Sequence, residues 1–116
     1  MTKINLAELL FKASHLFNAQ NFCEAESVLD KIFEHLPNEP QALHLMGCIY
    51  KAKGDLNKSI KLLKRSIEFD NSNPISFLNL GKVYRQKGDI YSAATYFRES
   101  LVRSQQVPET WICFGH

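Results

Sequence analysis

The stretch from Pro40 to Asp55, PQALHLMGCIYKAKGD, recurs 34 residues later, from Pro74 to Asp89, as PISFLNLGKVYRQKGD. Proline, the middle glycine, tyrosine and the final Lys-Gly-Asp hold the same places in both copies. The step continues to Pro108, and every glycine of the chain lies on it, at positions 47, 81 and 115 or 54 and 88. A fixed period of this size is typical of a repeat protein.

Each unit carries a helical pattern. After each proline, apolar residues recur at intervals of three and four, which is the period of an α-helix. Proline suits the first helical position because its missing N–H would be unpaired there anyway. The Gly-Asp pair can end this helix and cap the next, so second helices are expected over residues 22–36, 56–69 and 90–103. The sequence therefore predicts an all-α stack of helical hairpins.

This pattern resembles the tetratricopeptide repeat (TPR) family, in which bulky apolar, Leu, Gly, Tyr, Ala and Phe residues recur over a period of 34. The residues that carry the resemblance are Leu43, Met46, Gly47, Tyr50, Phe77, Leu80, Gly81, Tyr84, Ala93 and Phe97. The resemblance implies a right-handed superhelical stack of three helix-turn-helix hairpins plus a trailing C-terminal helix. One domain would then contain repeats over about 6–39, 40–73 and 74–107, the first fitting more loosely, and an incomplete fourth unit over 108–116.

Composition narrows the class of protein. The chain has 116 residues, 45% of them hydrophobic, and a formal charge of +2, so neither nucleic acid nor a membrane surface is expected as partner. Glu8 and Lys12 interrupt the apolar stretch that a signal peptide needs, and no apolar run is long enough to span a bilayer. Three cysteines without a C-x-x-C pair favour a reducing, cytoplasmic location.

Catalytic motifs are absent from the sequence. It contains no G-x-G-x-x-G, Walker, G-x-S-x-G or H-E-x-x-H motif, so we expect no enzyme and no cofactor. The expected function is a protein–protein interaction scaffold. The alternative is the N-terminal regulatory or substrate-recruiting module of a larger enzyme, since the family resemblance implies fusions to glycosyltransferases, sulfotransferases and methyltransferases.

In TPR-like superhelices, one face of each first helix lines a concave groove, and this resemblance implies a partner site here. On this face the chain is basic in the middle of the array. We predict a groove for an extended or helical peptide with acidic groups; the other interpretation is a solvated helix surface. The candidate groove residues are His44, Cys48, Lys51, Asn79, Lys82, Arg85 and Gln86.

Two more specific binding sites are not expected. The two-carboxylate clamp of chaperone-binding TPR proteins needs Lys and Arg side chains as well as Asn, and neither register of this chain supplies these cations at the matching places. His44 with Cys48, and Cys113 with His116, have the spacing of metal ligands. However, the two pairs lie two repeats apart, and adjacent packed helices are already about 8–10 Å apart. We therefore expect no metal site.

The last unit would expose an apolar stripe of Trp111, Ile112 and Phe114. Repeat arrays normally end in a polar capping helix. Either the chain is a fragment of a longer protein, or it buries this stripe in a homodimer through the C-terminal helix; the two interpretations are compatible.

Overall fold

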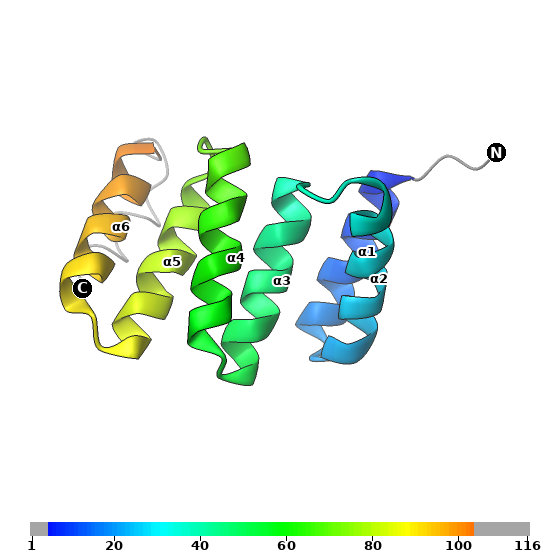
Figure 1. Ribbon diagram of the computed structural model, residues 1–116, viewed down its shortest axis with the longest axis horizontal. Helices are drawn as coiled ribbons and strands as arrows, with labels where there is room; N and C mark the ends of the chain where they lie inside the picture. The colour runs from blue at the N-terminus through cyan, green and yellow to red at the C-terminus, as the bar shows by residue number, and fades with distance from the viewer. Residues whose placement is uncertain (1–4, 104–116) are drawn as a thin grey trace.

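The computed structural model describes residues 5–103, and this part of the chain contains six α-helices and no strand (Figure 1). The prediction of an all-α stack of three hairpins is confirmed, and the second helices begin where the sequence placed them. The trailing helix expected from residue 108 onward lies outside the described residues. The six helices are α1 (Leu6–Asn18), α2 (Phe22–His35), α3 (Pro40–Lys53), α4 (Leu56–Phe69), α5 (Pro74–Lys87) and α6 (Ile90–Arg103).

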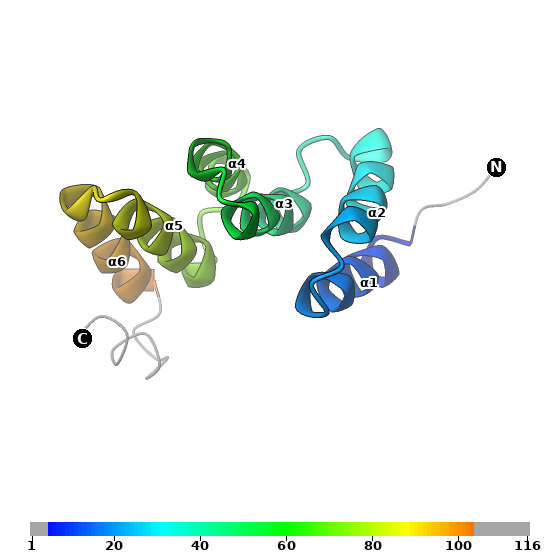
Figure 2. The ribbon, with the colours of Figure 1, turned by 90° about the horizontal axis from the view of Figure 1, so that it is seen from below.

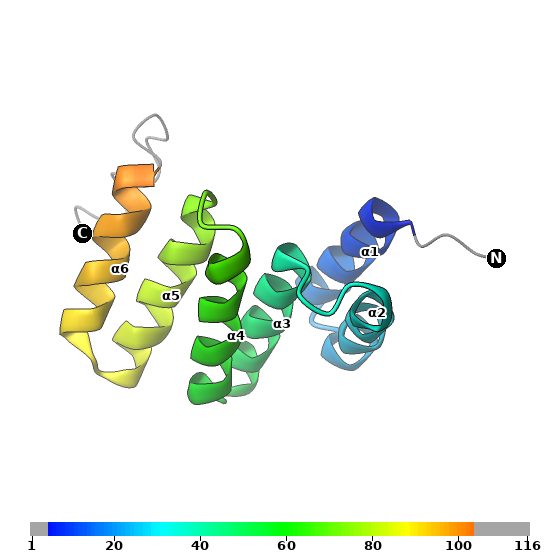
Figure 3. The same ribbon diagram turned by 45° about the horizontal axis from the view of Figure 1, so that its top comes forward.

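The hairpins follow one another along the longest axis of an elongated molecule that measures 48 × 29 × 24 Å. The two helices of each hairpin lie side by side, and the turns that join them all lie on the same side of the stack (Figure 3). Seen from below, the hairpins follow a curved path, with α3 between α1 and α5 (Figure 2). Since α3 contacts both α1 and α5, the first helices form one continuous face. No helix of the described part is long and apolar enough to cross a membrane.

Local chemistry fixes where the helices begin and end. Asp55 and Asp89 each accept a hydrogen bond from the backbone N–H three residues further on, as N-caps do. Gly54 and Gly88 take φ values of 90° and 99°, in the left-handed region that glycine enters without steric cost. In the first hairpin Gln20 holds the equivalent corner with φ 63°, a conformation that costs a non-glycine residue about 1–2 kcal/mol.

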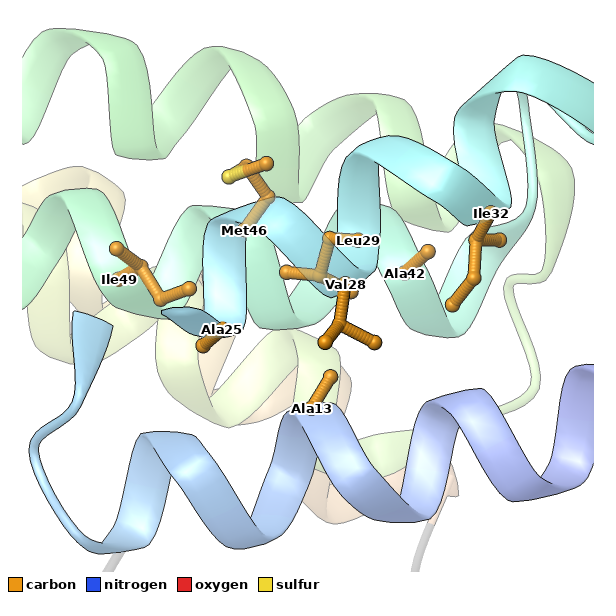
Figure 4. Packing of buried hydrophobic residues seen from close by; sticks show 8 residues of the cluster. All are labelled: Ala13, Ala25, Val28, Leu29, Ile32, Ala42, Met46 and Ile49. Carbon is orange, nitrogen blue, oxygen red and sulfur yellow. The ribbon is translucent and has the colours of Figure 1, made fainter. Parts of the chain in front are cut away.

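The hydrophobic core consists of two clusters, one toward each end of the stack. In the first, shown in Figure 4, Ala13 of α1 and Val28 of α2 point toward each other. The cluster extends to α3 through Ala42, Met46 and Ile49. The second joins α4, α5 and α6 through residues that include Leu63, Leu80, Val83 and Ala93. Each cluster therefore connects one terminal hairpin to a helix of the middle hairpin.

Within the second and third hairpins, the helices approach closely at a glycine. An added Cβ on Gly47 would lie 2.8 Å from Cγ of Leu63, and one on Gly81 would lie 2.6 Å from Cδ1 of Phe97. Real Cβ atoms essentially never show contacts this short. The recurring glycine thus makes room for the large side chain that faces it on the second helix.

Serine hydroxyls reinforce the same contacts. Ser59 donates to the carbonyl oxygen of Gly47 at 2.7 Å. Ser66 donates to the carbonyl of Pro40 at 2.7 Å, and Ser100, one repeat later, donates to that of Pro74 at 2.8 Å. The three serines are buried, and a satisfied hydrogen bond contributes about 0.5–1.5 kcal/mol. These bonds fix the register between the helices of a hairpin.

The Gly81→Ala variant tests the close approach. Alanine is favoured over glycine in a helix by about 1 kcal/mol, but here we expect the contact with Phe97 to cost about 1–3 kcal/mol, so the variant should have a lower free energy of unfolding. In a Phe97→Ala background the ring is gone, and Gly81→Ala should then be stabilising. Chemical denaturation followed by circular dichroism measures both differences. If Gly81→Ala changed the free energy of unfolding in the same direction in both backgrounds, the close-approach explanation would be contradicted.

Candidate functional site

The first helices of all three hairpins line a surface pocket of about 510 Å³. We call it the groove pocket. Phe17 comes from α1, and Cys48, Lys51 and Ala52 come from α3. The α5 residues are Asn79 and Gln86. Four of the seven predicted groove residues therefore line one pocket, Cys48, Lys51, Asn79 and Gln86.

A hydrogen-bond network beside the pocket links α3 to α5. The His44 ring lies between two α5 side chains, with Nδ1 2.8 Å from Oγ of Ser76 and Nε2 2.8 Å from Nδ2 of Asn79. The same amide nitrogen lies 3.6 Å from Sγ of Cys48, to which it donates. His44 and Cys48, four residues apart on α3, thus hold the Asn79 side chain at the edge of the pocket.

Burial changes the proton affinity of both α3 side chains. It lowers the pKa of His44 from the usual 6.5, because the charged imidazolium loses solvation. It raises the pKa of Cys48 to about 11, and the positive charges of Lys51 and Lys82 only partly oppose this shift. At neutral pH both His44 and Cys48 are therefore uncharged, and Cys48 lacks the thiolate that a nucleophile needs.

The remaining predicted residues lie around the pocket rather than in its lining. Lys82 is half-buried and close enough to act on the charge of Cys48. Arg85 is exposed, and its guanidinium carbon lies 5.7 Å from the centre of the Phe97 ring on α6. Sequence reasoning did not single out Ser76, although it stands three places before Asn79 and so shares that helix face.

Comparison with known proteins identifies the repeat. A family model described as TPR repeat matches residues 37–88, and one described as tetratricopeptide repeat matches residues 75–104. The chain belongs to the tetratricopeptide repeat (TPR) family. Both matches lie over the second and third hairpins, where the 34-residue pattern is strongest.

Three similar proteins illustrate the range of this TPR fold. The UDP-N-acetylglucosamine–peptide N-acetylglucosaminyltransferase of Caenorhabditis elegans is 29% identical over 92 residues, which are 76% of this chain and 8% of that protein. An O-GlcNAc transferase of Thermobaculum terrenum has a TM-score of 0.88 at 21% identity, over 98% of this chain and 22% of that one. The Yersinia enterocolitica type III secretion chaperone SycD, in complex with a peptide of the translocator YopD, has a TM-score of 0.82 at 16% identity, over 93% and 82%.

The two structural matches establish a shared fold. The TPR chain spans less than a quarter of the length of the first curated relatives that it matches.

His44 and Cys48, which have the spacing of metal ligands, both contact the side chain of Asn79 instead. Nδ2 of Asn79 lies 2.8 Å from Nε2 of His44 and 3.6 Å from Sγ of Cys48. Residues 5–103 hold no group of three or more metal-ligating side chains. The second pair, Cys113 and His116, and the stripe of Trp111, Ile112 and Phe114 lie outside the described residues.

The network predicts a pH-dependent stability. Because the folded chain holds His44 at a lower pKa than the unfolded chain, the unfolded state takes up a proton first as the pH falls. The free energy of unfolding should decrease as the pH is lowered through 6.5 and level off below the folded pKa. The carboxyl groups whose pKa is lowered, Asp70 and Asp89, titrate below 3.8, outside this window.

Denaturant titrations between neutral pH and pH 5 measure the slope of the free energy of unfolding against pH. The His44→Gln variant should flatten it, while His15→Gln, at an exposed position of α1, should leave it unchanged. An unaltered slope in His44→Gln would exclude His44 as its source.

Proposed function

We propose that this TPR chain is a protein-interaction scaffold that binds an extended or helical segment of a partner protein along α1, α3 and α5. The observation that carries the proposal is the groove pocket, to which all three first helices contribute. Its lining combines an aromatic ring, an ammonium group and two side-chain amides, which together can contact the apolar, charged and backbone groups of a peptide.

The comparisons support this mode of binding. The SycD structure contains a peptide of the translocator YopD. The fold of SycD matches 93% of the length of the present chain. A curved array of helices offers a partner segment many contacts along its length without a deep, enclosed cavity. We infer that the described residues contribute binding rather than catalysis, and that the partner is a protein or peptide.

A second function is supported by the similarity to an N-acetylglucosaminyltransferase, of which the chain spans 8%. In that case the described hairpins would be a regulatory or substrate-recruiting module, with catalysis encoded in a further segment. Sequence beyond His116 discriminates the two, because more repeats favour a scaffold and an α/β pattern favours an enzyme. The cytoplasmic location stays a prediction, supported by free thiols at Cys23 and Cys48.

A steric block of the groove tests the main proposal. Linear peptides selected on the whole chain from a random library should lose binding to Ala52→Trp, because the added ring fills the groove pocket. Ser27→Trp, at an exposed position of the second helix α2, should bind them normally. Fluorescence polarisation gives the affinities, and circular dichroism controls for folding. Equal binding to both variants and to the wild-type chain would exclude the groove as the site.

We also propose self-association through Trp111, Ile112 and Phe114. Support comes from α6, on which Ile90, Tyr91 and Val102 are 62%, 90% and 60% exposed, apolar surface that a second copy of the chain could cover together with this stripe.

Analytical ultracentrifugation tests this second surface. We expect a dimer that Trp111→Asp converts to a monomer, because a carboxylate in an apolar interface is strongly unfavourable. Phe11→Asp, at an exposed aromatic residue of α1, is the control and should leave the dimer intact. A monomeric wild-type chain at high concentration would rule out self-association.

A further inference from the structure

The partners of the two His44 ring nitrogens determine where the proton of the neutral ring sits. Nε2 lies 2.8 Å from Nδ2 of Asn79, and the amide nitrogen of asparagine can only donate a hydrogen bond. Nε2 must therefore accept, which leaves the proton of the ring on Nδ1. Nδ1 lies 2.8 Å from Oγ of Ser76, which accepts this N–H. The two α5 side chains thus select one of the two tautomers of His44.

The same contacts fix the orientation of the Asn79 amide. Its two N–H groups have two acceptors, Nε2 of His44 and Sγ of Cys48 at 3.6 Å. Its oxygen, Oδ1, receives no hydrogen bond from any described residue. No buried side-chain oxygen or nitrogen in this part of the chain lacks a partner, so Oδ1 is open to solvent. Since Asn79 lines the groove pocket, the pocket holds an acceptor whose orientation depends on a histidine.

A proton on Nε2 makes this orientation unfavourable. Nε2–H of His44 and the amide N–H of Asn79 would then be two donors facing each other across 2.8 Å. A half-turn of the amide removes the conflict, because Oδ1 can then accept a charge-assisted hydrogen bond from the imidazolium. Cys48 tolerates both orientations, since a thiol is a weak donor as well as a weak acceptor. It stays a thiol at this pH, because burial raises the pKa of Cys48 to about 11.

The surroundings keep His44 neutral until the solution is acidic. Burial lowers the pKa of His44 from the usual 6.5. The titratable groups that act on this network are Cys48 and Lys51 on α3 and Lys82 on α5, and α1 contributes the uncharged Phe17 to the pocket. No Asp or Glu is among the residues that line the pocket. A positive charge on His44 therefore appears only below pH 6.5, taken up from solvent at Nε2.

We infer that His44 is a positioning residue that sets the hydrogen-bonding polarity of the groove pocket. With a neutral ring, Asn79 presents Oδ1, and the pocket takes an uncharged N–H donor of the partner. With a protonated ring, Asn79 presents its own N–H groups, and this partner is released. Lys51 lines the same pocket and repels a cationic donor. The inference rests on the proposed function and assigns the regulation of that site by pH.

Nuclear magnetic resonance of the whole chain tests the orientation without a ligand. The nitrogen-15 shifts of the His44 ring should show a protonated Nδ1 and an unprotonated Nε2 at neutral pH. As the pH falls, the side-chain amide resonances of Asn79 should shift with the same midpoint as the ring, and in His44→Gln they should not shift. A proton on Nε2 at neutral pH, or an Asn79 amide that does not respond to the titration of His44, would overturn the inference.

Peptide affinity tests the consequence for binding. Linear peptides without histidine, capped at both ends, are selected on the wild-type chain at neutral pH and measured by fluorescence polarisation. One pH unit below the His44 midpoint they should bind about tenfold more weakly, since His44 must lose one proton before the peptide binds. His44→Gln should lose this dependence, and His15→Gln, which removes an exposed histidine of α1, should keep it. The same pH dependence in both variants would exclude His44 as its source.

Changes in the peptide identify the donor. Replacing backbone amides by esters, or side-chain amides by apolar groups, one position at a time, should abolish the pH dependence at one position; no such position would contradict an N–H donor.

The Ala52→Trp variant separates this inference from the proposed function. If it blocks the peptides although their affinity for the wild-type chain does not depend on pH, the control of polarity by His44 is wrong and the proposed function stands. If Ala52→Trp does not block them, the proposed function itself fails.

Discussion

The structure depends on the close approach of two helices within the second and third hairpins. At Gly47 and Gly81 a hydrogen atom stands where any other residue would place a carbon, and a large side chain of the second helix fills the space. A buried serine of the same second helix then donates a hydrogen bond to a carbonyl of the first. Sterics and hydrogen bonding together fix both the distance and the register in these two hairpins, so each of them is a defined unit for stacking.

Stacking of these units creates the groove. Because α3 lies against α5, side chains separated by about one period in sequence come into contact, and His44 meets both Ser76 and Asn79. The same packing takes part of the solvent away from Lys51 and Lys82. Both lysines act electrostatically on the Cys48 thiol, so positive charges from two different hairpins come together beside the pocket.

The first hairpin shows how far a repeat can depart from the pattern. Gln20 replaces the corner glycine and still takes the left-handed conformation, and Asn21 precedes α2 without a side-chain capping bond. These departures weaken the sequence signal more than they change the shape, since Ala13, Ala25 and Leu29 still bury the core face of the hairpin. The backbone N–H groups of Gln20 and Asn21 donate to the carbonyls of Phe17 and Leu16, as the equivalent groups do at the glycine corners.

The sequence by itself determined the six helices, their ends and the hairpin pairing, because capping, proline placement and apolar periodicity act over a few residues and repeat every 34. It also placed Cys48, Lys51, Asn79 and Gln86 on one face, because helical geometry is regular. Only the tertiary structure decided that Ser76 completes the His44 network, that Phe17 from α1 joins the pocket, and that Arg85 lies against Phe97. These depend on how neighbouring hairpins pack and on the rotamers that packing allows, which no local period encodes.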